Sequence, residues 1–172
     1  NIDVKILLFN NQIYGLTKGQ FSPTSRLGLI NKSAPYGTID QPINPLRIAL
    51  AAGATFVART SDNDMNHMKE VLTRAANHKG SAFVEILQNC VIFNDKVHEE
   101  YYGVKTHKDN LMYLHGGEKM LYGKTTEKAF VFNSKGRLES VDATKADASR
   151  IAVHDENDGD LAYLLSSLEY PE

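Results

Sequence analysis

Two adjacent amides and a glycine-containing strip follow the first apolar run of the sequence. Residues 10–24 read Asn-Asn-Gln-Ile-Tyr-Gly-Leu-Thr-Lys-Gly-Gln-Phe-Ser-Pro-Thr, directly after a nearly continuous apolar run at residues 4–9. An amide oxygen in such a place can bind a hard cation such as magnesium, which prefers few protein ligands together with phosphate oxygens. The pattern therefore suits a diphosphate-binding edge, and it equally suits an ordinary Asx-rich turn.

Alternating strand-like and helix-like segments must position that strip. The first expected elements are a strand at residues 4–9 and a helix capped by Asn44 with Pro45 in its first turn. They are followed by a short strand at 55–58, a helix capped by Ser61 or Asp62 with Gly80 as its left-handed stop, and a strand at 81–87. This alternation predicts an α/β fold with a doubly wound, mostly parallel sheet. Open sheets of this kind bind ligands beyond the carboxyl ends of their strands, where the strip begins.

The second half of the chain has a different character. We assign residues 1–105 to the sheet domain and residues 106–172 to a C-terminal α+β extension. Within the extension, two short apolar runs flank the turn-like residues 133–136 and predict a hairpin. A capped helix is expected from about residue 158 to residue 168.

The overall composition excludes several classes of function. A formal net charge of -2 gives no electrostatic case for binding nucleic acid or an acidic membrane surface. The longest nearly apolar stretch, residues 6–9, is far shorter than the roughly 18 residues of a membrane span. Cys90 is the single cysteine, and the N-terminus lacks a basic segment followed by an apolar one. The cytoplasm is therefore the expected location.

Residues 10–24 resemble the end of the thiamine-diphosphate motif in the β subunits of 2-oxoacid:ferredoxin oxidoreductases. The resemblance continues downstream in blocks that follow the family's order: residues 33–37, 44–45, 53–59, 78–80, 83–90, 93–94 and 153–155. It therefore covers most of the chain and implies a thiamine-diphosphate-binding fold, of which residues 1–105 would be the C-terminal part.

The first block of that resemblance implies a cofactor site. Asn11 matches the side-chain ligand of magnesium, and Ile13 matches the residue whose backbone carbonyl completes the protein's share of the coordination. Gly15, Leu16 and Thr17 match the strip beside the cofactor's diphosphate and thiazolium, where Leu16 and Thr17 are expected to serve catalysis. The family's motif opens upstream with Gly-Asp-Gly, whose Asp is the other magnesium ligand. This chain begins after that point, so we expect a fragment that is inactive and binds the cofactor poorly alone.

Cys90 stands in the block Gln-Asn-Cys, followed by Phe93 and Asn94. In the family this cysteine matches the last of the four that hold a four-iron four-sulfur cluster. A lone cysteine is more commonly a buried core thiol, and the resemblance favours the ligand.

The resemblance implies the oxidative decarboxylation of a 2-oxoacid to an acyl-coenzyme A, with electrons passed to ferredoxin and an α subunit completing the active site. Lys18 lies next to where the family places substrate, and its ammonium could bind the second carboxylate of 2-oxoglutarate, which favours that substrate over pyruvate. Two alternatives stay open: a non-catalytic α/β assembly or binding module, and another thiamine-diphosphate decarboxylase or transketolase-like enzyme.

Overall fold

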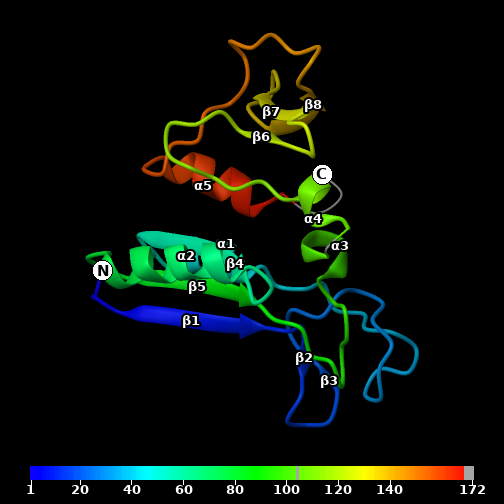
Figure 1. Ribbon diagram of the computed structural model, residues 1–172. Helices are drawn as coiled ribbons and strands as arrows, with labels where there is room; N and C mark the ends of the chain where they lie inside the picture. Colours follow the sequence, from blue (N-terminus) through cyan, green and yellow to red (C-terminus); the bar gives the residue numbers. More distant parts are fainter. Residues whose placement is uncertain (104, 169–172) are drawn as a thin grey trace. The chain divides into compact units, whose positions relative to one another are not determined.

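The computed structural model describes residues 1–103 and 105–168, which form two compact units (Figure 1). The first unit runs from Asn1 to His98 and the second begins at Glu99. The elements of the first unit are β1 (Lys5–Asn10), β2 (Ile13–Tyr14), β3 (Gln20–Phe21), α1 (Pro45–Ala51), β4 (Phe56–Ser61), α2 (Met65–Asn77) and β5 (Ala82–Leu87). The expected domain division after residue 105 stays a prediction.

The first unit is built on a parallel sheet with the strand order β1-β5-β4. The whole of β5 pairs with both neighbours, from Lys5 and Phe56 opposite Ala82 to Asn10 and Ser61 opposite Leu87. The central position of β5 explains its nearly continuous apolar sequence, because helices cover it on both faces. The expected α/β fold with a doubly wound parallel sheet is confirmed.

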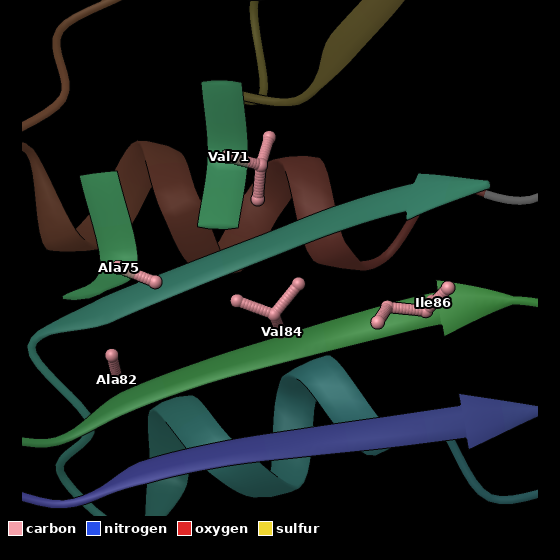
Figure 2. Packing of buried hydrophobic residues seen from close by; sticks show 5 residues of the cluster. All are labelled: Val71, Ala75, Ala82, Val84 and Ile86. Carbon is pink, nitrogen blue, oxygen red and sulfur yellow. The ribbon is translucent and has the colours of Figure 1, made fainter. Parts of the chain in front are cut away.

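One face of the sheet packs against α2, as Figure 2 shows. Val71 and Ala75 of α2 contact Ala82, Val84 and Ile86, which are alternate residues of β5 and therefore share a face. Val84 is 0% exposed and Ile86 is 1% exposed. Burying each of these two side chains contributes roughly 1.5–3 kcal/mol.

The start of α2 differs from the prediction. Asp64 caps the helix, and its carboxylate accepts a hydrogen bond from the backbone N–H of His67 over 3.0 Å. The two predicted caps have other positions: Ser61 is the last residue of β4, and the Asp62 carboxylate accepts a hydrogen bond from the backbone N–H of Asn89 over 3.0 Å. The expected stop at Gly80 was also wrong, because α2 ends at Asn77.

The opposite face of the sheet is covered by α1 (Figure 2). Asn44 caps this helix by accepting from the backbone N–H of Arg47 over 3.1 Å, and Pro45 occupies the first turn, as the sequence predicted. Pro suits this position because the first N–H groups of a helix have no intrahelical acceptor. Leu46 and Ala49 are the buried residues of α1.

The second unit is α+β. Its elements are α3 (Glu99–Tyr102), α4 (His107–Asn110), β6 (Leu121–Tyr122), β7 (Lys128–Phe132), β8 (Leu138–Asp142) and α5 (Gly159–Ser166). The strands form an antiparallel sheet in the order β6-β7-β8, with the predicted turn between β7 and β8 closed by Gly136 at a φ of 70°. Met120, Phe130, Ala152 and Leu161 form its core. Across the described residues, no helix has the length and apolar character needed to cross a membrane.

Candidate functional site

A buried polar cluster lies on the α1 face of the sheet, where β1 ends. Glu85 of β5 is 1% exposed, and its two carboxylate oxygens accept from Nδ2 of Asn10 and from Nε of Arg59, each over 2.7 Å. Oδ1 of Asn10 accepts from the Thr24 hydroxyl over 2.7 Å and from the backbone N–H of Gln12 over 3.1 Å. The cluster fixes the direction in which the chain leaves β1.

His98, the last residue of the first unit, also binds Asn10. Its ring is buried, and Nε2 donates to the backbone carbonyl of Asn10 over 3.0 Å, which assigns the neutral Nε2–H tautomer. Burial lowers the pKa of His98 below its ordinary value; Arg26 and Arg59 add to this effect, whereas the bond to Asn10 and the charge of Glu85 oppose it. His98 is therefore a neutral donor near pH 7.

The two residues predicted to bind magnesium follow directly. Oδ1 of Asn11 accepts from the backbone N–H of Ile13 over 3.2 Å, so the Asx turn and the metal-ligand interpretation involve the same oxygen. An amide oxygen has two lone pairs, so this bond leaves one for a cation. Between them, Gln12 adopts a φ of 54°, an unfavourable left-handed conformation that the hydroxyl of Ser25 stabilises by donating to the Gln12 carbonyl over 2.6 Å.

The strip beyond these residues is a tight loop between β2 and β3. Gly15 and Gly19 pack against the ring of Phe93, and a Cβ at Gly19 would lie 3.1 Å from Cδ1 of that ring. Leu16, Thr17 and Lys18 are exposed, and Leu16 reaches 99%. The predicted cofactor, catalytic and substrate residues therefore lie on one loop, on which the side chains of residues 16–18 are accessible.

Cys90 opens a turn that touches this loop. Its backbone carbonyl accepts from the backbone N–H of Asn94 over 2.9 Å, and the two residues form an isolated antiparallel bridge. Nδ2 of Asn94 donates to the backbone carbonyl of Asn11 over 2.9 Å. Cys90 is a free cysteine and is half-buried, so it is not a fully buried core residue, and its role as a cluster ligand stays a prediction. Within the described residues, no cluster of three or more His, Cys, Asp or Glu side chains could hold a metal.

A cavity of about 620 Å³ extends along the α1 face of β1 to this site. Its apolar wall includes Ile6 and Leu8 of β1 and Ile48 of α1, and its polar end includes Asn11 and Thr24. That volume lies in the usual range of small-molecule and cofactor sites. The polar end coincides with the edge at which open parallel sheets bind ligands.

Residues 1–86 match the family described as thiamine pyrophosphate enzyme, C-terminal TPP binding domain. The chain belongs to this family. Thiamine pyrophosphate is thiamine diphosphate, so the predicted cofactor class is confirmed for the domain, and the match covers β1 to most of β5. The residues of this TPP-binding domain fit a magnesium-bound diphosphate in part: Asn11 offers one amide oxygen, and magnesium prefers few protein ligands together with phosphate and water oxygens.

Two curated proteins are similar in sequence to most of this chain or to its first part. The chain is 45% identical over 163 residues to 2-oxoglutarate oxidoreductase subunit KorB of Mycobacterium tuberculosis, covering 95% of this chain and 43% of that protein. It is 47% identical over 108 residues to 2-oxoacid:ferredoxin oxidoreductase 1, subunit beta, of Aeropyrum pernix, covering 63% and 34%. The predicted resemblance to these β subunits is confirmed, and the chain spans less than half the length of either relative.

A solved structure of the same kind of oxidoreductase is similar to part of this chain. The TPP-binding domain is similar to 2-oxoglutarate:ferredoxin oxidoreductase from Magnetococcus marinus with 2-oxoglutarate, coenzyme A and succinyl-CoA bound. The TM-score is 0.54 at 41% sequence identity, and the match covers 55% of this chain and 33% of that one.

Sequence reasoning gave no role to Glu85, Asn94 or His98. A signal existed for Glu85, which is the one charged residue in the predicted strand at residues 81–87 and has apolar neighbours on both sides. A charged residue in such a strand is almost never buried unless it is paired. Asn94 belongs to a block of the family resemblance, but neither its residue type nor that of His98 points to a partner, and those partners lie 83 and 88 residues away in the sequence.

Proposed function

We propose that this chain is the part of a ferredoxin-dependent 2-oxoacid oxidoreductase that holds the metal and diphosphate end of thiamine diphosphate. The observation that carries the proposal is the position of Asn11, at the carboxyl end of β1 in a TPP-binding domain and on the polar wall of a cavity. The names of the relatives, and the 2-oxoglutarate and coenzyme A bound in the Magnetococcus structure, support oxidative decarboxylation to an acyl-coenzyme A.

Each residue of the loop has a proposed part. Asn11 Oδ1 and the Ile13 carbonyl would hold magnesium, and Gly15 would let the backbone approach the diphosphate because it carries no side chain. Leu16 and Thr17 would border the thiazolium. The bound cofactor supplies the electron sink for loss of carbon dioxide, and the protein supplies orientation and electrostatics.

The substrate proposal rests on Lys18. Its side chain is exposed and makes no ion pair or side-chain hydrogen bond with any other residue that the structure describes. A mobile ammonium on this loop can donate to the distal carboxylate of 2-oxoglutarate, a group that pyruvate lacks. We therefore propose 2-oxoglutarate as the substrate.

Electron transfer requires more than this chain. We propose that Cys90 supplies one thiolate to a four-iron four-sulfur cluster, and that an α subunit and ferredoxin complete the assembly. A cluster of this type takes four cysteine ligands, and the chain contains one. We propose the cytoplasm as its compartment, because a reducing environment keeps such thiols free.

The test uses the oxidoreductase complex that contains this chain, stripped of metal and cofactor with a chelator. Restoring magnesium and thiamine diphosphate should restore reduction of ferredoxin driven by 2-oxoglutarate. Asn11→Ala should weaken magnesium-dependent cofactor binding, measured by calorimetry, by about tenfold or more, because metal-site changes commonly cost that much. Asn110→Ala in α4 is the control. A complex that reduces no acceptor with any 2-oxoacid would instead favour the non-catalytic module.

A further inference from the structure

Asn94 connects two segments that sequence places far apart. Its Nδ2 donates to the Asn11 carbonyl over 2.9 Å and lies 3.4 Å from the Gln12 carbonyl. These two carbonyls belong to the short stretch between the proposed metal-binding atoms, Oδ1 of Asn11 and the carbonyl of Ile13. The Asn94 amide therefore binds the backbone of the proposed metal site without being one of its ligands.

The backbone of residues 11–13 has an unfavourable conformation at its centre. Gln12 has a φ of 54°, a left-handed conformation that is unfavourable for a residue with a Cβ atom. The Ser25 hydroxyl donates to the Gln12 carbonyl, and Nδ2 of Asn94 donates to the Asn11 carbonyl and more weakly to that of Gln12. Without one of these donors, Gln12 can relax toward negative φ, which would change the separation of the two proposed ligand atoms.

Asn94 is itself held in place. Its backbone N–H donates to the Cys90 carbonyl over 2.9 Å, which closes the turn that begins at Cys90. The preceding residue, Phe93, packs its ring against Gly15 and Gly19 of the proposed cofactor strip. The turn thus contacts the loop at two places, through a hydrogen bond near Asn11 and through an aromatic ring near Gly19.

We propose that Asn94 is a positioning residue that holds residues 11–13 in the conformation that binds magnesium and the cofactor's diphosphate. The inference rests on the proposed function, since it assumes that Asn11 binds the metal. In this role Asn94 prepares the site before the metal arrives, so its loss affects metal affinity and leaves turnover of the fully loaded enzyme intact. Residues that orient metal ligands typically change affinity by about 10- to 100-fold when mutated.

The experiment measures magnesium binding in the complex that contains this chain. Asn94→Ala removes the donor, and Asn94→Leu removes it while keeping the same branched shape and number of side-chain heavy atoms. The dissociation constant of magnesium, measured by calorimetry with saturating thiamine diphosphate, should rise about tenfold in both variants. The turnover number at saturating magnesium and cofactor should stay within about twofold of wild type. Asn110→Ala is the matched control, because its amide also donates to a backbone carbonyl, that of Glu100, over 2.8 Å.

The outcomes separate the two proposals. If wild type binds magnesium and cofactor, Asn11→Ala weakens binding and both Asn94 variants bind as wild type does, the positioning role is overturned and the proposed function stands. If the turnover number falls while magnesium affinity is unchanged, the positioning role is likewise overturned. If wild type shows no magnesium-dependent binding of thiamine diphosphate, the proposed function itself fails, and the positioning role fails with it.

Discussion

Asn10 and Glu85 are bonded side chain to side chain across neighbouring parallel strands, with Nδ2 of Asn10 2.7 Å from Oε1 of Glu85. This bond settles which way the Asn10 amide faces, because only its nitrogen can donate to a carboxylate. Its oxygen is then directed toward the Thr24 hydroxyl and the Gln12 N–H. A buried acid in the central strand thereby determines the path of the backbone into the proposed metal-binding loop.

Glu85→Ala should destabilise the chain by about 1–3 kcal/mol, because it leaves the buried Nδ2 of Asn10 without an acceptor. The effect at Arg59 should be smaller, since that side chain is 40% exposed and water can replace its partner. The free energy of unfolding in urea measures the loss. Glu139→Ala on the exposed side of β8 is the control and should change stability by less than about 0.5 kcal/mol. Equal losses in the two variants would contradict a structural role for Glu85.

The stability of the first unit should depend on pH through His98. Burial holds the pKa of the folded His98 below the ordinary value, so the unfolded chain takes up a proton at higher pH than the folded chain does. The free energy of unfolding should therefore fall as pH drops below about 6.5, the ordinary value, toward the lower folded pKa. Protonation would also place a second N–H at Nδ1, which is buried and has no partner among the described residues.

The His98→Gln variant tests this pH dependence, because a neutral amide can still donate to the Asn10 carbonyl. Urea unfolding of wild type and variant at pH 7.5 and pH 5.5 gives two differences to compare, and the other histidines contribute equally to both. Wild type should lose more stability on acidification than the variant does. Parallel losses would mean that His98 does not titrate between the folded and unfolded states as its burial implies.

Gly19→Ala should disturb the proposed cofactor strip more than Gly28→Ala does. Both glycines have positive φ, at 98° and 77°, so an alanine is strained at either position. Only at Gly19 would the new Cβ lie 3.1 Å from the Phe93 ring; at Gly28 the space is open to 4 Å. Thermal unfolding and thiamine diphosphate retention should both be lower for the Gly19 variant. A Phe93→Leu change should recover part of that loss, and failure to do so would refute the clash.

Lys18→Ala should shift substrate preference. A charge-assisted hydrogen bond to the distal carboxylate is worth roughly 1.5–3 kcal/mol, or about one to two orders of magnitude in discrimination. The ratio of kcat/KM for 2-oxoglutarate to that for pyruvate should therefore fall by about 10- to 100-fold in the complex. Lys32→Ala, at another exposed lysine, should leave the ratio unchanged. An unchanged ratio in the Lys18 variant would leave the choice of 2-oxoglutarate without support from this chain.

Cys90→Ser should lower the iron content of the complex and slow electron delivery to ferredoxin, because a hydroxyl is a poor substitute for a thiolate ligand. Thiamine diphosphate content should stay near the wild-type value, since the turn is closed by the hydrogen bond from the Asn94 N–H to the backbone carbonyl of residue 90, which serine preserves. Iron analysis and the rate of ferredoxin reduction measure the two effects. Full iron content in the variant would make Cys90 an ordinary half-buried thiol.

Much of the first unit could be predicted from local patterns. The cap at Asn44, Pro45 in the first turn and the apolar runs of β1 and β5 each signal their element within a few residues. The start of α2 was missed because Ser61 and Asp62 are good caps in isolation. Pairing with β5 extends β4 as far as Ser61, so the helix cannot begin before Asp64. Tertiary pairing overrode a local preference there.

Only part of the candidate site could be predicted from the sequence. Residues 10–19 are contiguous, so composition and family resemblance could single out Asn11, Ile13 and Lys18 from the sequence. The contacts that hold these residues in place could not be predicted from the nearby sequence. Glu85, Asn94 and His98 approach Asn10 and Asn11 only in the folded chain. Loop geometry at a site of this kind depends on contacts between distant segments, which no window of sequence contains.

The edge position of β1 has a practical consequence for work with this chain by itself. Among the described residues β1 has a strand neighbour on one side only, and Phe9 on it is 60% exposed. An unpaired row of backbone donors and acceptors beside apolar side chains is a template for strand exchange between molecules. The unfolding midpoint of the purified chain should therefore vary with the concentration of the chain. Its free energy of unfolding is best measured over a series of dilutions.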